Sequence, residues 1–245
     1  MDADWCSTSY LHRCLVVYNS THVFLFDRIK NSSEEIDMEW FVTVLELIGT
    51  LSFAVSGAMT ALKKHMDVLG VCVLGLVTAC GGGILRDVLM GNLPPVMFRD
   101  PIYALAAVVC SLIVFLPFAR RKLLKEDRLY EILMLWSDAL GLGIFTAVGI
   151  TTAMHAGYSS RFFAAFLGVI TGVGGGVLRD VLAGQPPYIF VKHFYACAAM
   201  LGAIACVLLW PLAGERGSIF ACCGTILILR ILAARYHWSL PKAND

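Results

Sequence analysis

Seven stretches of this sequence are apolar over the length that a helix needs to cross a lipid bilayer. They cover residues 41–62, 68–90, 101–119, 130–153, 162–183, 194–212 and 217–235. A membrane-spanning helix takes roughly 17–25 such residues. Hydrophobic types make up 58% of the chain and charged types 15%, whereas an average soluble domain is about a quarter charged. The sequence therefore predicts an all-α membrane protein with seven transmembrane helices.

The basic residues between these stretches predict the orientation, because short cytoplasmic loops carry an excess of Lys and Arg. The first, third and fifth breaks and the C-terminal tail hold most of them: Lys63, Lys64, Arg120, Arg121, Lys122, Lys125, Arg128, Lys192, Arg235 and Lys242. The intervening breaks hold Arg99, Arg161 and Arg216. We therefore expect a multi-pass protein of the plasma (inner) membrane, with its N-terminus outside and its C-terminus in the cytoplasm.

The chain contains an internal repeat. ELIGTLSFAVSGAMTAL, from Glu46, aligns with DALGLGIFTAVGITTAM, from Asp138, and GGGILRDVL, from Gly81, recurs as GGGVLRDVL, from Gly174. Each copy contains three predicted helices, and an odd number makes the two copies cross the membrane in opposite directions, as in many transport proteins. The predicted organisation is a polar, disordered leader over 1–37, a first repeat over 38–122, an inverted second repeat over 123–213, and a seventh helix with a tail over 214–245.

The two glycine triplets, Gly81, Gly82, Gly83 and Gly174, Gly175, Gly176, allow two interpretations. Each glycine weakens a helix by about 1 kcal/mol relative to alanine, so a kink or break could turn freed carbonyls toward a polar cavity. Alternatively, the missing side chains let two helices pack closely. The second copy at a mirrored depth favours a pore or substrate site. Thr78 and Thr171 lie on the same faces and could offer hydroxyls to an ion, or bond back to their own helices.

Each triplet is followed by adjacent charges, Arg86 with Asp87 and Arg179 with Asp180. Neighbours project about 100° apart on a helix, so we do not expect them to pair face to face. A charge inside the membrane needs a partner, and comparison of depths predicts two pairs, Glu46 with Arg86 and Asp138 with Arg179. Such pairs would serve either as structural clamps or as gating and permeation charges.

Other classes of site are disfavoured by the sequence. The cysteines lie mostly in apolar runs, with neither a CxxC pair nor a Cys/His cluster at ligand spacing, so we expect no metal site. The triplets lack the Lys-Ser/Thr of a phosphate-binding loop. Without a nucleophile–base set, no enzyme is expected, and neither a cofactor nor a nucleic-acid partner is indicated.

Two copies of GGGxLRDVL, each followed by Pro-Pro, resemble the trimeric intracellular cation (TRIC) channel family, and most closely its bacterial branch, whose members are often labelled glycine transporter domain proteins. The likeness covers about residues 38–235. It implies a homotrimer in the lipid bilayer with an hourglass pore in each protomer, bent at both glycine triplets and permeable to potassium or sodium. The lysine-containing lipid-binding motif of the animal channels is not located in this sequence.

The primary hypothesis is thus a channel for monovalent cations. The alternative is a secondary transporter for a small solute such as glycine, which would share the fold and site but need two gates and alternating access. The third hypothesis is that the chain is a structural membrane protein without transport activity.

Overall fold

The computed structural model describes residues 37–191, 194–236 and 238. The predicted leader, except for Asp37, lies outside the described residues, as do Lys192 and Lys242. The chain divides into two compact units, Met1–Val44 and Leu45–Asp245. Of the first unit, residues 37–44 are described and are helical, and the Thr43 hydroxyl donates to the Glu39 carbonyl oxygen (2.8 Å). All contacts described below lie within the second unit.

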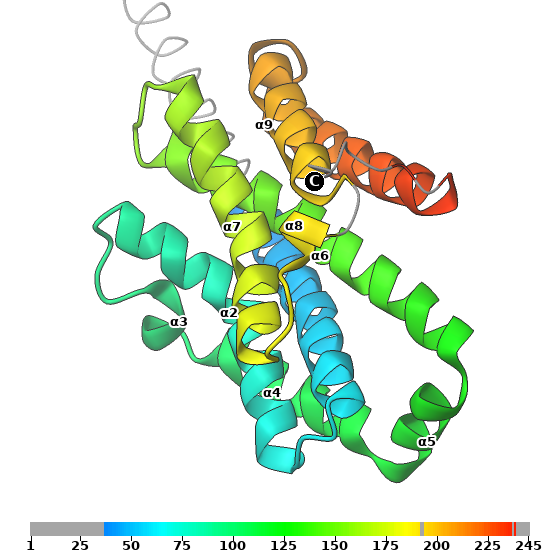
Figure 1. Ribbon diagram of the computed structural model, residues 1–245. Coiled ribbons are helices and arrows are strands. Elements are labelled where there is room, and N and C mark those ends of the chain that lie inside the picture. Colours follow the sequence, from blue (N-terminus) through cyan, green and yellow to red (C-terminus); the bar gives the residue numbers. More distant parts are fainter. Residues whose placement is uncertain (1–36, 192–193, 237, 239–245) are drawn as a thin grey trace, which may run out of the picture. The chain divides into compact units, whose positions relative to one another are not determined.

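The first half of this unit contains four helices after the one that enters it (Figure 1). The entering helix covers Asp37–Lys63, and α2 (Val68–Leu89), α3 (Val96–Arg99), α4 (Ile102–Phe115) and α5 (Pro117–Lys125) follow. The Asp67 side chain caps α2 by accepting from the Gly70 amide (2.7 Å). The predicted single helix over 101–119 is wrong at its end. Proline lacks an amide proton, so α4 stops at Phe115 and α5 starts at Pro117, bent by 67°.

The second half contains α6 (Asp127–His155), α7 (Arg161–Leu182), α8 (Tyr188–Val191) and α9 (Tyr195–Arg235). The Ser160 hydroxyl caps α7 through the Phe163 amide (3.2 Å). Within α9 the helix is interrupted at Gly214, where φ is 67° and ψ is −176°, a conformation that glycine adopts without strain. The interruption separates two limbs that correspond to the predicted helices over 194–212 and 217–235 (Figure 1).

Five of the described helices are long and apolar enough to cross a membrane: Asp37–Lys63, α2, α6, α7 and α9. The bent pair of α4 and α5 adds a sixth if it is counted as one span. All regular elements in the described part of the chain are helices. The protein is thus an all-helical, multi-pass membrane protein.

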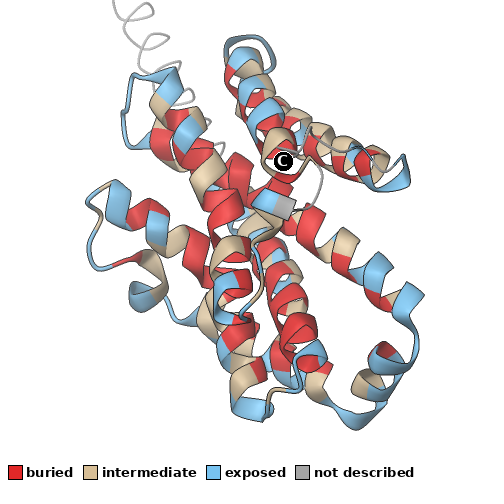
Figure 2. Ribbon diagram, viewed as in Figure 1, coloured by how far each residue is buried: buried red, intermediate tan, exposed pale blue. Residues whose placement is uncertain are grey.

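Small residues let the helices approach closely. α7 packs against α2 and α6, α9 packs against α6, and α4 packs against α2. A methyl group on Gly57 would lie 2.8 Å from the Cα of Gly75, and one on Gly149 would lie 2.8 Å from the Cα of Gly168. These two close approaches fall at matching positions of the sequence repeat. Figure 2 shows buried residues concentrated where the helices cross in the middle of the view.

The rings of Phe53 and Phe145, which also match in the repeat, join the two halves. Their centroids are 5.3 Å apart, and Phe53 is almost completely buried. Aromatic pairs at this separation add attraction beyond the area they bury. The two halves are therefore in contact through side chains at matching positions of the repeat.

Candidate functional site

The two glycine triplets meet where α2 passes α7. A methyl group on Gly82 would overlap the carbonyl oxygen of Thr171, and one on Gly175 would overlap the carbonyl oxygen of Thr78. A methyl group on Gly174 would lie 3.3 Å from the Cα of Gly82. The two backbones are therefore in contact, and glycine is the residue that leaves space for this contact.

Of the two interpretations of the triplets, the one that includes a break of the helix is wrong on that point. α2 runs without interruption from Val68 to Leu89, and α7 runs from Arg161 to Leu182. The low helix propensity of glycine is offset because each missing side chain makes room for the other helix. The close-packing interpretation therefore describes this conformation.

The last glycine of each triplet has a different environment from the other two. A methyl group on Gly83 would have the Arg86 Nη2 atom as its nearest neighbour, at 4.0 Å. On Gly176 it would lie 2.7 Å from the Tyr195 hydroxyl. The third position therefore points away from the helix crossing and toward the charged residues.

Thr78 and Thr171 are both fully buried and use their hydroxyl protons within their own helices. Thr78 donates to the Leu74 carbonyl oxygen and Thr171 to the Leu167 carbonyl oxygen, each at 2.6 Å. Of the two interpretations of these threonines, the back-bonded one matches the structure. A hydroxyl bonded in this way can still accept from water or contact a cation through its remaining lone pair.

We call Glu46, Arg86, Asp87 and Tyr103 the first clasp. Arg86 Nη1 lies 3.6 Å from Glu46 Oε1, which confirms the predicted proximity. Arg86 Nε donates to Asp87 Oδ1 (2.9 Å), and the Tyr103 hydroxyl donates to Glu46 Oε2 (2.9 Å). Arg86 Nη1 also reaches Thr152 Oγ1 on α6, at 3.3 Å.

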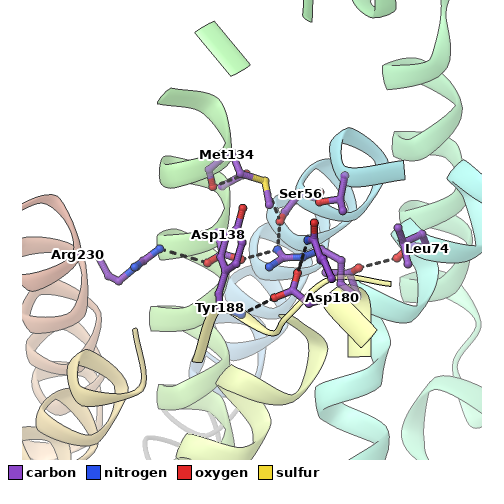
Figure 3. Close-up of polar contacts among 12 residues, drawn as sticks. Ser56, Leu74, Met134, Asp138, Asp180, Tyr188 and Arg230 are labelled. Atoms are coloured by element: carbon purple, nitrogen blue, oxygen red, sulfur yellow. Dashed lines mark hydrogen bonds and ion pairs between the residues drawn. The ribbon is translucent and has the colours of Figure 1, made fainter. Parts of the chain in front are cut away.

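We call Asp138, Arg179, Asp180 and Tyr195 the second clasp (Figure 3). Arg179 Nη1 lies 2.7 Å from Asp138 Oδ1, which confirms the second predicted pair. Arg179 Nη1 also donates to Ser56 Oγ, whose own proton points to the Met134 sulfur at 3.5 Å. Each arginine therefore binds an acid in its own repeat and a hydroxyl in the other.

The expectation that adjacent arginine and aspartate side chains do not pair is wrong. Arg179 Nε lies 2.8 Å from Asp180 Oδ1, as Arg86 Nε does from Asp87 at 2.9 Å. Two side chains 100° apart at the backbone still meet, because an arginine is long and carries N–H donors on both edges of its planar head. One edge binds the following aspartate, which leaves the other for the acid on the neighbouring helix.

The second oxygen of each aspartate accepts a backbone amide from the segment after Pro-Pro. Asp87 Oδ2 accepts from the Val96 amide and Asp180 Oδ2 from the Tyr188 amide, each at 2.8 Å. These amides open α3 and α8, the two short helices that the sequence did not predict. The Arg-Asp pair therefore ties the end of a long helix to the segment that follows it.

The two clasps differ in exposure. The first borders a small hollow of about 40 Å³, open to the surface, that is lined by Glu46, Thr50, Gly83, Arg86, Asp87 and Tyr103 together with apolar side chains. In the second clasp Asp138 Oδ2, Arg179 Nη2 and the Tyr195 hydroxyl are buried without a hydrogen-bond partner in the described residues.

Two further residues adjoin the second clasp. The guanidinium of Arg179 lies 4.9 Å from the centre of the Tyr188 ring, and burial raises the pKa of the Tyr188 phenol to about 12 although Arg179 opposes the shift. Arg230 Nη2, from α9, lies 3.5 Å from Asp138 Oδ2. Sequence reasoning missed Arg230 because it lies outside the repeat, in a segment with no counterpart to compare.

Comparison with known proteins is consistent across sequence and structure. A family model described as "Glycine transporter" matches residues 43–118 and again 135–211, one match for each sequence repeat. The UPF0126 inner membrane protein YadS of Escherichia coli K12 is 37% identical over 80% of this chain and 93% of its own length. The UPF0126 membrane protein YvgT of Bacillus subtilis is 35% identical over 84% and 98%.

Solved structures identify the wider family. A TRIC cation channel whose conductance was studied structurally is 36% identical, with a TM-score of 0.72, and the match covers 83% of this chain and 97% of that one. The chain belongs to the TRIC family. The TRIC orthologue of Rhodobacter sphaeroides is 32% identical, with a TM-score of 0.71, over 81% and 99%. The two family-model matches contain the charged residues of both clasps, whereas Arg230 lies beyond them.

Proposed function

We propose that this TRIC-family protein is a membrane channel for monovalent cations, K⁺ and Na⁺. The observation that carries the proposal is its likeness to solved TRIC cation channels, at 36% and 32% identity over more than four-fifths of the chain. The family-model description names glycine transport, but the solved relatives are cation channels, so a carrier for glycine is not favoured.

We place the permeation path beside the crossing of α2 and α7, between the two clasps. In this conformation the crossing is sealed by contact between the backbones of Gly82 and Thr171 and of Gly175 and Thr78. Conduction would therefore require α2 and α7 to separate slightly at the glycines. Backbone carbonyls and the threonine oxygens would then supply ligands suited to a monovalent cation.

We also propose seven membrane passes arranged as two inverted repeats and a final helix. α9 has 41 residues, which as one straight helix would extend about 60 Å, twice the thickness of the hydrocarbon layer. The interruption at Gly214 lets its two limbs cross the membrane separately. Counting α4 as a further pass completes the seven. In the orientation predicted from the basic residues, α5 would then lie in the cytoplasm and the α6–α7 loop would lie outside.

This orientation can be tested with cysteines placed at Ser159, in the α6–α7 loop, and at Arg121, in α5; both positions are exposed. A membrane-impermeant maleimide applied to intact cells should label the first and not the second. Labelling of the cysteine in Arg121→Cys alone would show that the orientation is the opposite of the one proposed.

We also propose a homotrimer, by likeness to the solved TRIC relatives. The mass of the purified protein in lipid nanodiscs tests this oligomeric state.

The channel itself is tested by recording purified protein in planar bilayers between asymmetric KCl and NaCl solutions. Unitary currents whose reversal potential follows the cation gradient support the proposal. Protein-free bilayers are the control. The same preparation in liposomes should show no saturable counterflow of labelled glycine. Counterflow of glycine in the absence of currents would contradict the channel proposal and would show that the protein is a glycine carrier.

A further inference from the structure

The two clasps carry different formal charges. The first has the carboxylates of Glu46 and Asp87, and within the described residues their ion pairs are with Arg86 alone. The second has the carboxylates of Asp138 and Asp180 with Arg179, and Arg230 beside it supplies a second arginine. The first clasp is therefore formally negative, whereas the second clasp together with Arg230 is neutral, although the repeat-derived residues of the two clasps correspond one to one.

Arg230 reaches the second clasp from the C-terminal limb of α9, and its guanidinium points toward Asp138 (Figure 3). Its side chain is 6% exposed, and its guanidinium stacks 4.8 Å from the centre of the Tyr195 ring. Its Nε has no hydrogen-bond partner in the described residues, and its Nη2 lies 3.5 Å from Asp138 Oδ2. This guanidinium is held by attraction to the Asp138 carboxylate and by stacking on the Tyr195 ring. It makes few of the hydrogen bonds of which an arginine is capable.

Glu46, which matches Asp138 in the repeat, is bound by a tyrosine hydroxyl where Asp138 faces Arg230. The second oxygen of Glu46 accepts from the Tyr103 hydroxyl at 2.9 Å. Asp138 is one methylene shorter than Glu46, and the Tyr195 hydroxyl has no hydrogen-bond partner in the described structure. The free oxygen of Asp138 instead faces the Arg230 guanidinium.

We infer that Arg230 is a tethered counter-cation, which neutralises Asp138 and thereby sets how strongly permeant cations bind on the side of the second clasp. The inference rests on the proposed channel function. With Arg230 in place, an entering cation meets a neutral site there, whereas the first clasp offers a net negative one. A unit charge in a buried site acts strongly because the surrounding dielectric is low.

The test is Arg230→Gln, with Arg230→Lys to retain the charge and Arg235→Gln, an exposed arginine on the same helix, as the matched control. Conductance is measured while K⁺ is varied on the side of the second clasp, the cytoplasmic side in the proposed orientation. We expect the half-saturating K⁺ concentration to fall about ten-fold in Arg230→Gln and to stay unchanged in Arg230→Lys and Arg235→Gln. An unchanged value in Arg230→Gln, or the same fall in Arg230→Lys, would overturn the inference.

A second measurement separates this inference from the channel proposal. The unfolding temperature of purified protein is compared in KCl and in choline chloride of equal ionic strength. The unfolding temperature of Arg230→Gln should be higher in KCl than in choline chloride, whereas that of the wild type should be the same in both. The double variant Asp138→Asn/Arg230→Gln should lose this K⁺-specific stabilisation. If the wild type carries no current but this gain is seen, the channel proposal fails and the neutralised cation site stands. If currents are normal and the gain is absent, the inference fails alone.

Poor folding of Arg230→Gln would not block the test. The double variant with Asp138→Asn removes both charges and should restore folding, while Asp138→Asn alone leaves Arg230 in excess. That single variant should raise the half-saturating K⁺ concentration. No rise in a folded Asp138→Asn protein counts against a role for this charge balance.

Discussion

Gly82 of α2 and Gly175 of α7 pass each other in backbone contact: a methyl group on Gly82 would lie 3.4 Å from the Gly175 nitrogen and would overlap the Thr171 carbonyl oxygen. Neither position has room for a side chain. The neighbouring Gly83 has space, since a methyl group there would still be 4.0 Å from Arg86 Nη2. One triplet therefore contains both a constrained glycine and its own control.

We predict that Gly82→Ala and Gly175→Ala each destabilise the protein by about 2 kcal/mol, the cost typical of overpacking a tight contact. Because the obstructing atoms are backbone, they cannot rotate away. Thermal unfolding in detergent measures the loss. Gly83→Ala, where a methyl group would be 4.0 Å from Arg86 Nη2, and Gly224→Ala, where nothing lies within 4 Å, should be neutral or slightly stabilising. Equal losses at positions 82 and 83 would contradict the packing explanation.

The two arginines should differ in their contribution to stability. Arg179 and Asp138 are 0% and 1% exposed, whereas Glu46, the partner of Arg86, is 21% exposed. We predict that Arg179→Gln costs about 3–5 kcal/mol, because it removes the ion-pair partner of the buried Asp180 and leaves Asp138 with only the more distant Arg230. We predict that Arg86→Gln costs roughly 1–3 kcal/mol. Unfolding temperatures compared in one detergent check the order, and a larger loss for Arg86→Gln would contradict it.

Asp87 and Asp180 should fix the segments after the Pro-Pro pairs. Replacing either by alanine removes the acceptor for the Val96 or the Tyr188 amide and frees the adjacent arginine. Hydrogen exchange of that amide should accelerate in the matching half of the molecule and remain slow in the other. Asp100→Ala, which removes the acceptor for a different amide, that of Ile102 at the start of α4 (3.1 Å), is the control. Unchanged exchange in Asp87→Ala would show that this segment is held by other contacts.

Thr78→Val and Thr171→Val should each change stability by less than about 1 kcal/mol, because each hydroxyl donates to its own helix rather than across it. Threonine and valine have nearly the same shape, so these variants remove the hydroxyl group while leaving the packing almost unchanged. If the channel proposal holds, K⁺ conductance in the two variants then reports whether the hydroxyl oxygens contact the ion. A loss of several kcal/mol would mean that they support the fold in a way the observed bonds do not.

The sequence predicted the long apolar helices, which hydropathy marks, and the two charge pairs, which comparison of depths indicated. Glu46 with Arg86 and Asp138 with Arg179 followed from counting residues along helices whose direction the loops implied. The helix ends needed local chemistry: Pro117 separates α4 from α5, and both short helices begin after Pro-Pro.

Three features could not be obtained in this way. The contact between an arginine and the next aspartate depends on side-chain reach, which positions on a helical wheel do not represent. The continuity of α2 through Gly81 to Gly83 depends on α7, a helix far away in the sequence, because the gain from close packing compensates for low propensity. Arg230 approaches Asp138 only because α9 turns back at Gly214.

The composition of the clasps bears on how such a chain could have arisen. Each takes its acid, arginine, aspartate and tyrosine from a single repeat, so a chain of half this length would already contain its own charge pairing. Its glycines, however, would lack the second backbone that they contact here. Two copies of a three-helix chain, associating as a dimer, would supply that contact, and fusion of their genes would then allow one copy to change independently of the other. The differences between the clasps, glutamate at position 46 against aspartate at position 138, and Arg230 beside Asp138, are of a kind that identical subunits encoded by one gene could not carry on one side alone.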